Sequence, residues 1–122
     1  MPSVIALVDD LMFLSRIREA ARGGRAEVQA VRTLPELVEA CRTPPRLVIL
    51  DLDSRRLPGL EALRALRQEA ALAEVPVVGF LSHVDAEGAR RAREAGCTRV
   101  LARSAFVREV ADLLAAAAPP EA

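Results

Sequence analysis

The sequence lacks tryptophan and tyrosine, and aromatic residues make up only 2% of it. Hydrophobic residues nevertheless make up 52%, so we expect an aliphatic core. The 122 residues suffice for one domain with its own core, and no long linker marks a second domain. We therefore predict a single domain over residues 1–118, with residues 119–122 as a frayed tail.

The chain also lacks an excess of either charge, because 17 basic residues balance 17 acidic ones. This balance gives no support to binding of nucleic acid or of an anionic membrane surface. No apolar run approaches the roughly 20 residues that a membrane-spanning helix needs. The N-terminus has neither the basic region nor the long apolar segment of a signal peptide. We therefore expect a cytoplasmic protein with no nucleic-acid or membrane partner.

Cysteine and histidine are too few for a zinc site, because no third cysteine and no histidine cluster completes a ligand set. We interpret Cys41 and Cys97 as reduced thiols, since the chain has no export signal. The one histidine, His83, falls in a predicted loop, and no second histidine or nucleophile forms a triad with it in the sequence. A solvated or satisfied loop histidine is the favoured interpretation.

Short apolar runs alternate with segments of helical spacing along the chain. Continuous apolar runs bounded by turn residues or acids are typical of strands buried on both faces. We predict five strands, over residues 4–8, 27–31, 47–51, 75–81 and 97–102. We predict five helices, over residues 11–21, 33–42, 59–71, 85–95 and 104–117. Thr33, Asp85 and Ser104 are the expected N-terminal caps of the second, fourth and fifth helices.

This alternation predicts an α/β fold with a parallel sheet and helices on both faces. Parallel strands all deliver their last residues to one edge, where open α/β sheets place their ligands. Asp9 and Asp10 follow the first strand. Asp51 ends the third strand, and Asp53 lies just beyond it. If the first and third strands are neighbours, these carboxylates converge.

Carboxylates packed this closely raise each other's pKa unless a cation neutralises them. One candidate is Mg²⁺, a hard cation that takes oxygen ligands. The other is Arg103, at the end of the fifth strand. The loop after the first strand is acidic and has no glycine, so it would repel phosphate. This argues against an enzyme or a nucleotide binder, and we expect no enzymatic activity.

With these features the sequence resembles the receiver domain of two-component response regulators, over about residues 4–116. The resemblance rests on short motifs in the right order and spacing, namely Asp9-Asp10, Asp51, Gly59 eight residues later, Val75–Val78 and Glu94–Cys97. It implies the flavodoxin-like receiver fold, with five parallel strands in the order 2-1-3-4-5. It also implies histidine kinases or other signalling proteins as partners.

The resemblance further implies the roles of the acids. Asp51 takes the position of the phosphoacceptor and is also a metal ligand, Asp9 and Asp10 are the other Mg²⁺ ligands, and the backbone carbonyl of Asp53 completes the set. An aspartate that attacks a phosphoryl group forms an acyl phosphate by nucleophilic catalysis. Mg²⁺ would offset the repulsion between the carboxylate and the phosphate.

The end of the fifth strand departs from the family. Receiver domains carry a lysine there, usually followed by a cis proline, whereas this chain has Arg103 and Ser104. Arginine keeps the charge as a planar fork, which could pair bidentately with Asp51 and block it. A cis peptide bond is no longer expected, because such bonds are rare before residues other than proline.

Three further positions depart from the family. The hydroxyl residue at the end of the fourth strand is Leu81, which cannot hydrogen-bond a phosphoryl group. Ser82 would replace it as the switch hydroxyl if the strand were shifted by one residue, but we favour Ser82 as merely a small residue. The aromatic residue of the fifth strand is Val100, which suggests apolar packing. A loop proline is replaced by Arg55, which together with Arg56 is either solvated or folded over the acids.

These departures favour an atypical or pseudo-receiver. We predict a stand-alone response-regulator receiver protein in phosphorelay signal transduction that acts through protein–protein contacts. The alternative is a conventionally phosphorylated receiver, with Asp51 as phosphoacceptor and a dependence on Mg²⁺. No DNA-binding module follows the last helix, so we do not expect direct transcriptional output.

The predicted contact surface is the family's output face, made by the fourth helix, fifth strand and fifth helix. A homodimer could form through it. This face includes Ala89, Arg90, Arg93, Val100 and residues 106–110. Within it, we expect Phe106 to belong to the core.

Overall fold

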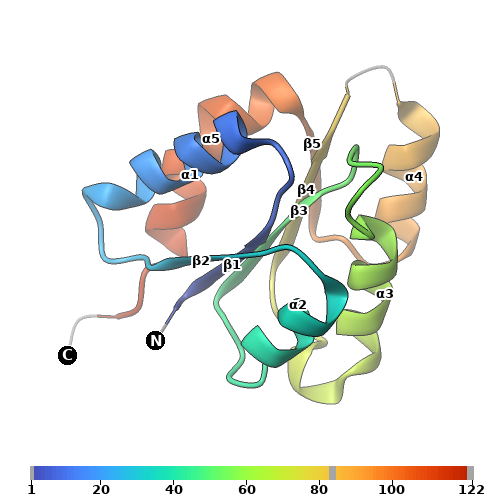
Figure 1. The fold of residues 1–122 in the computed structure, drawn as a ribbon, viewed down its shortest axis with the longest axis horizontal. Coiled ribbons are helices and arrows are strands. Elements are labelled where there is room, and N and C mark those ends of the chain that lie inside the picture. The colour runs from blue at the N-terminus through green and yellow to red at the C-terminus, as the bar shows by residue number, and fades with distance from the viewer. Residues whose placement is uncertain (1, 83–84, 121–122) are drawn as a thin grey trace.

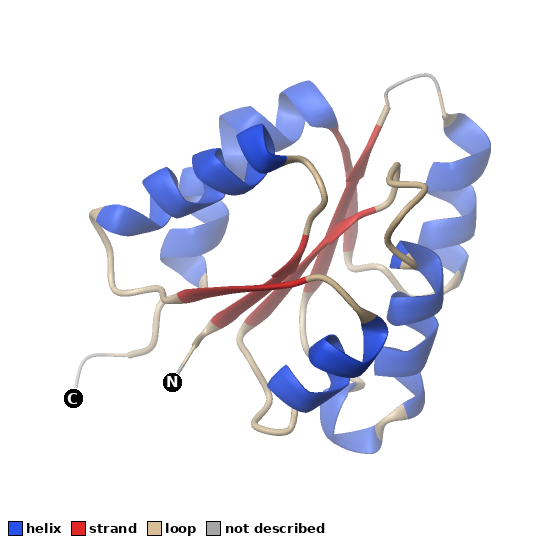
Figure 2. Cartoon of the chain, in the orientation of Figure 1, coloured by secondary structure: helices blue, strands red, loops and turns tan. Residues whose placement is uncertain are grey.

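A parallel five-stranded sheet forms the centre of the protein (Figure 2). The computed structural model describes residues 2–82 and 85–120, so His83 lies outside the described residues. The strand order is β2-β1-β3-β4-β5. The strands are β1 (Val4–Leu7), β2 (Val28–Val31), β3 (Leu47–Asp51), β4 (Val77–Leu81) and β5 (Arg99–Ala102). The fold class and strand order expected from the sequence are confirmed.

Helices cover both faces of the sheet (Figure 1). On one face lie α1 (Leu11–Arg22) and α5 (Arg103–Ala116). On the other lie α2 (Leu34–Ala40), α3 (Gly59–Gln68) with the short 3-10 turn η1 (Ala70–Leu72), and α4 (Ala86–Glu94). Within residues 2–82 and 85–120, none of the helices has both the length and the apolar character to span a bilayer.

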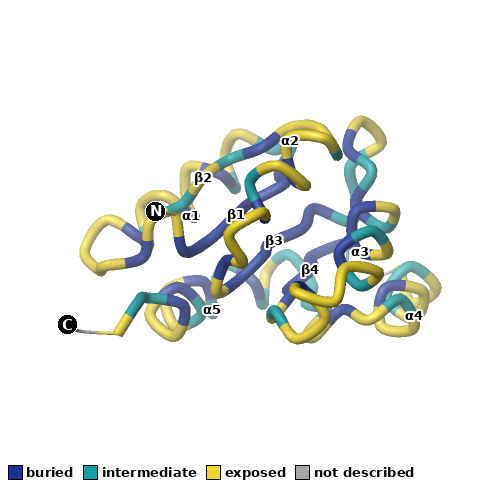
Figure 3. Tube along the Cα trace, turned by 90° about the horizontal axis from the view of Figure 1, so that it is seen from below, coloured by how far each residue is buried: buried dark blue, intermediate teal, exposed yellow. Residues whose placement is uncertain are grey.

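The core has two apolar layers, one on each face of the sheet. In β1, Val4 and Ala6 pack in the layer under α1 and α5, whereas Ile5 and Leu7 pack in the layer under α2, α3 and α4. Because both faces are covered, every residue of β1, β3 and β4 is buried, as Figure 3 shows. This double burial explains why these strands have continuous rather than alternating apolar sequences.

Element boundaries differ from the predicted ranges by a few residues. The apolar run of the first strand extends to Val8, but the paired strand ends at Leu7. Likewise β4 begins only at Val77, and α3 ends at Gln68 before the chain continues in η1. The difference arises because side-chain character marks what is buried, whereas strand and helix ends depend on backbone hydrogen bonds.

Two of the three predicted helix caps are confirmed. Thr33 and Asp85 each accept a backbone N–H from the first turn of their helix, at 3.1 and 2.7 Å. The prediction for Ser104 was wrong, because α5 begins one residue earlier, at Arg103. Ala102 occupies the cap position and has no side-chain hydrogen bond to offer. Strand β5 therefore passes directly into α5, and Arg103 lies at the edge where the acids gather.

Both cysteines are buried free thiols. Burial raises the pKa of Cys41 to about 11 and also raises the pKa of Cys97. Both thiols therefore stay protonated at neutral pH, and protonated thiols are poor nucleophiles and metal ligands.

Candidate functional site

The ends of β1 and β3 bring the acids together. The two strands are paired neighbours, with Leu7 opposite Leu50. Asp51, the last residue of β3, is only 1% exposed, and the backbone N–H of Asp9 donates to its Oδ2 at 3.4 Å. This hydrogen bond joins the loop after β1 directly to the end of β3.

Backbone N–H groups occupy both oxygens of Asp51. Its Oδ1 accepts from Asp53 and Ser54, each at 3.1 Å, and its Oδ2 accepts from Asp9. Burial has the largest effect and raises the pKa of the Asp51 carboxyl above its ordinary value. These hydrogen bonds and the charge of Arg103 offset part of that rise. Among the ion pairs of the described residues, none includes Asp51. The carboxyl is thus held by backbone dipoles rather than by a side-chain cation.

Asp10 is the N-terminal cap of α1. Its Oδ1 accepts the backbone N–H groups of Met12 at 2.8 Å and Phe13 at 3.2 Å. These bonds, with that from Phe13 foremost, and the neighbouring Arg103 lower the pKa of Asp10. From the sequence, Asp10 was expected only as a metal ligand. An aspartate directly before a helical pattern is also a cap signal, and that signal was available.

Arg103 spans two of the acids. Its Nη1 lies 3.3 Å from Oδ2 of Asp10, and its Nε lies 3.3 Å from Oδ2 of Asp53. The guanidinium carbon is 4.6 Å from the ring centre of Phe13 and 5.4 Å from that of Phe80. Cations over aromatic faces are attracted by the ring quadrupole. The sequence located the arginine at the acids, but the ring contacts were not foreseen.

The pairing of Arg103 with Asp51 that the sequence suggested is replaced by this bridge. Asp51 is buried, and its oxygens accept backbone amides of the β3–α3 loop and of the loop after β1. Asp10 and Asp53 lie further out and keep more exposed side chains, at 38% and 25%. The guanidinium therefore meets the outer acids.

A second cation neutralises Asp9. Arg32 directly follows β2, and its Nη2 lies 3.3 Å from Oδ1 of Asp9. The hydroxyl of Ser54 donates to Oδ2 of the same carboxylate at 3.2 Å. Neither residue was expected at the site from the sequence, although the rule that parallel strands end at one edge also applies to Arg32. Arg55 and Arg56 are exposed and contact no acid among the ion pairs of the described residues.

The carboxylates expected to bind Mg²⁺ do not fit that role in this arrangement. Mg²⁺ needs oxygen ligands in near-octahedral geometry at about 2.0–2.1 Å. Both oxygens of Asp9, Asp10 and Asp51 already accept hydrogen bonds or ion pairs. Across the described ranges, no group of three or more acidic, cysteine or histidine side chains could hold a metal ion. The groups that offset the negative charge of the acids are backbone N–H groups, Arg32 and Arg103.

Apolar side chains occupy the expected switch positions. Leu81, the last residue of β4, is 3% exposed and lies beside Leu52 and Leu60 at a hollow of about 190 Å³. Val100 packs against the apolar layer under α2, α3 and α4. Ser82 follows the strand, is partly buried, and accepts the backbone N–H of Asp85 through its carbonyl at 3.0 Å.

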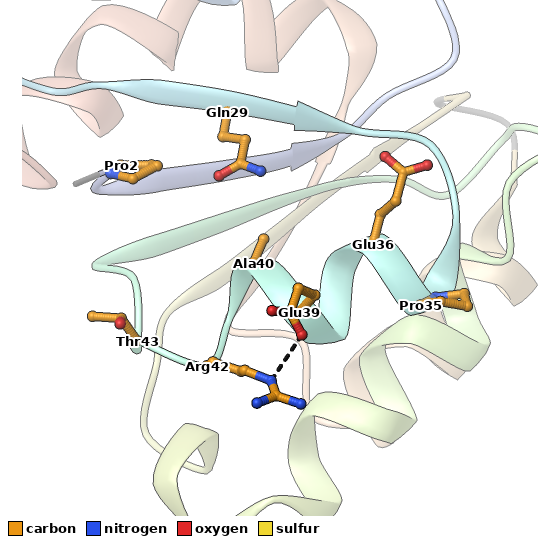
Figure 4. A pocket seen from close by; sticks show the side chains of 8 residues that line it. All are labelled: Pro2, Gln29, Pro35, Glu36, Glu39, Ala40, Arg42 and Thr43. Atoms are coloured by element: carbon orange, nitrogen blue, oxygen red, sulfur yellow. Dashed lines mark ion pairs between the residues drawn. The ribbon is translucent and has the colours of Figure 1, made fainter.

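A larger hollow, of about 650 Å³, lies between β2 and α2 (Figure 4). Its lining residues are Pro2, Gln29, Pro35, Glu36, Glu39, Ala40, Arg42 and Thr43. Figure 4 shows Gln29 of β2 pointing toward the helix, with Ala40 of α2 pointing back toward the strand. Glu39 and Arg42 neutralise each other at 2.8 Å. The hollow lacks the concentration of buried charge found at Asp51, which remains the candidate site.

The sequence matches no protein-family model and no curated protein. Its structure is similar to that of a response regulator from Hahella chejuensis, with a TM-score of 0.82 at 19% identity over 96% of this chain and 95% of that one. NtrX from Brucella abortus gives a TM-score of 0.76 at 20% identity over 94% of this chain, which spans only 27% of that chain. The Mn²⁺-bound form of response regulator Rcp1 gives 0.75 at 20% identity over 92% and 91%. At these identities the likeness concerns the fold, and the chain has the fold of response-regulator receiver domains.

Proposed function

We propose that this receiver-fold chain is a response-regulator protein of phosphorelay signalling that works through protein contacts, without enzymatic activity and without phosphorylation of Asp51. The observation that carries the proposal is the bridge from Arg103 to Asp10 and Asp53. A phosphoryl group on Asp51 would need a cation free to offset its charge. Arg103 and Arg32 form ion pairs with acids other than Asp51.

Two further features support the proposal. Asp51 is almost fully buried, and backbone donors engage both of its oxygens, so a phosphodonor would have to displace these bonds. At the end of β4, Leu81 offers no hydroxyl that could bind a phosphoryl group. Without that hydrogen bond, phosphorylation would have no polar link from Asp51 to β4.

The contact surface that we propose centres on the first turn of α1. Leu11 and Met12 are exposed there by 72% and 70%, which is unusual for large apolar side chains. Met12 and Phe13 line a hollow of about 530 Å³ between α1 and α5, together with Val107. A signalling protein such as a histidine kinase would bury these side chains on docking. We propose that this contact takes place in the cytoplasm.

The face of α4, β5 and α5, which the sequence suggested for a homodimer, carries ion pairs. Arg90 of α4 pairs within its own helix with Glu87 and with Glu94. Arg99 of β5 pairs with Glu109 of α5 at 2.7 Å. Contacts through this face would therefore include charged side chains.

The test is incubation of the protein with acetyl phosphate and Mg²⁺, followed by intact-mass measurement. We expect no added phosphoryl group on either wild type or Asp51→Asn. A stable phosphoryl adduct on the wild type that Asp51→Asn abolishes would contradict the proposal.

That contrary outcome would establish the second candidate, a conventionally phosphorylated receiver that depends on Mg²⁺. The retention of an acid at Asp51, at the end of β3, favours this candidate. So does the fold shared with Rcp1, whose structure is described as Mn²⁺-bound. It would require Arg103 to leave Asp10 and Asp53 before the metal enters.

A further inference from the structure

We infer that Arg103, with Arg32 as a second cation, takes the place of a divalent metal in this site, so that metal binds there only when Arg103 is removed. The inference rests on the proposed function, because it concerns how the same acidic site is kept closed. It accounts for how these acids can lie close together while their oxygens pair with side chains of the protein.

The two arginines together carry the same positive charge as one divalent ion. Arg103 forms ion pairs with Asp10 and Asp53, and Arg32 forms one with Asp9. Together they supply two positive charges. The chain contains no lysine, so both cations are planar guanidinium groups, and one such group can donate to two carboxylates through different nitrogens.

The rings of Phe13 and Phe80 support the guanidinium of Arg103. The chain has three aromatic residues, of which Phe13 and Phe80 lie against this guanidinium and Phe106 packs against both of those rings. The ring centres of Phe13 and Phe80 are 4.9 Å apart, and those of Phe80 and Phe106 are 4.8 Å apart. Because α5 follows β5 without a loop, the backbone of Arg103 is fixed by both elements.

Because it is covalently part of the chain and held by these contacts, Arg103 binds the acids in preference to a metal ion. Mg²⁺ loses its water reluctantly and is usually held by only one or two carboxylates, so its binding to a protein site is modest. To enter here it would have to break two ion pairs and lift the guanidinium from the rings of Phe13 and Phe80. If Arg103 is removed, the remaining carboxylates repel one another, and a divalent cation relieves that repulsion.

The test compares Mn²⁺ and Mg²⁺ binding, by calorimetry, to wild type and Arg103→Met. Methionine keeps an apolar chain over the rings but removes the charge. We expect Mn²⁺ to bind Arg103→Met about tenfold or more tightly than wild type, equivalent to about 1.4 kcal/mol. Added Mn²⁺ should also raise the melting temperature of Arg103→Met and leave that of wild type unchanged.

The matched control is Arg64→Met, because Arg64 is exposed on α3 and forms no ion pair with the acids of the site among the described contacts. It removes the same charge from the chain, and its Mn²⁺ binding should equal that of wild type. Equal binding by wild type and Arg103→Met would overturn the inference. So would equal gains in Arg103→Met and Arg64→Met, since net charge alone would then explain the effect.

If Arg103→Met does not fold, Arg103→Lys decides the matter. Its ammonium is a point charge that cannot span both carboxylates as the fork does. Mn²⁺ should then bind more tightly than to wild type, and unchanged binding would overturn the inference. No phosphodonor is used, so these results are independent of the mass measurement on Asp51. Phosphorylation of wild type would end the proposed function, whereas unchanged metal binding in the variants would end only this inference.

Discussion

At the scale of single residues, the two oxygens of the Asp10 carboxylate have different functions. One oxygen caps α1, and the other pairs with Arg103. Substitutions can separate these functions, because asparagine is as good a helix cap as aspartate but carries no charge. Alanine removes both the cap and the ion pair.

We predict that Asp10→Ala lowers the free energy of unfolding at neutral pH by about 1 kcal/mol, the usual contribution of a helix cap. Asp10→Asn should cost only roughly a few tenths of a kcal/mol, because its ion pair is partly exposed. Urea unfolding monitored by circular dichroism measures both. Equal losses in the two variants would show that the charge, and not the cap, is what matters.

The charge on Asp10 also has a pH signature. Its folded pKa is below the ordinary value of 3.8, so its ionised form favours the folded state. This contribution is complete above pH 3.8 and is lost as the pH falls through the folded pKa. The small difference between wild type and Asp10→Asn should therefore disappear in acid.

At the scale of secondary-structure elements, the start of α3 is placed by direct contact with β3. A Cβ atom on Gly59 would lie 2.7 Å from the backbone carbonyl oxygen of Asp51. Such a contact is shorter than real Cβ atoms tolerate, and the neighbour is backbone rather than a flexible side chain. In the sequence, Gly59 stood out only as part of a family motif. The contact gives the physical reason for glycine at this position.

We predict that Gly59→Ala destabilises the protein by about 1–3 kcal/mol, the usual cost of overpacking. Alanine gains about 1 kcal/mol in helix propensity over glycine, which offsets only part of that cost. Gly23→Ala is the matched control, because nothing lies within 4 Å of its Cβ position and its φ of −88° suits alanine. Thermal unfolding of both variants tests this. A stable Gly59→Ala would mean that α3 can shift away from β3.

At the scale of the whole molecule, the acids of the site bring opposite pH dependences to folding. Burial raises the folded pKa of Asp51, whereas capping and Arg103 lower that of Asp10. Between pH 3.8 and the folded pKa of Asp51, the folded protein binds more protons than the unfolded chain. The contribution of Asp51 to stability therefore falls as the pH rises through this window.

We predict that the stability of wild type relative to Asp51→Asn decreases as the pH rises from about 4 and levels off once Asp51 is ionised in the folded state. The loss of hydrogen-bond acceptors in asparagine adds a constant offset that does not depend on pH. Urea unfolding of both proteins across this range gives the difference. A difference that rises with pH would mean that the charges around Asp51 outweigh its burial.

The order of elements, the sheet and the edge at which the acids gather could all be predicted from the sequence. These features follow from local patterns, since apolar runs, helical spacing and caps involve residues close together in the chain. Parallel strands then bring their ends to one edge regardless of side-chain detail. The failure at Ser104 shows the limit of the same reasoning, because a strand that continues directly into a helix leaves no cap position for it.

Only the tertiary structure decided which acid Arg103 meets. Arg103 is separated from Asp53 by 50 residues and from Asp10 by 93, and the sequence places Asp51 equally within its reach. The choice depends on which oxygens the backbone amides have already taken and on where Phe13 and Phe80 support the guanidinium. Such choices are made by orientation over a few ångströms, and no periodicity along the chain records them.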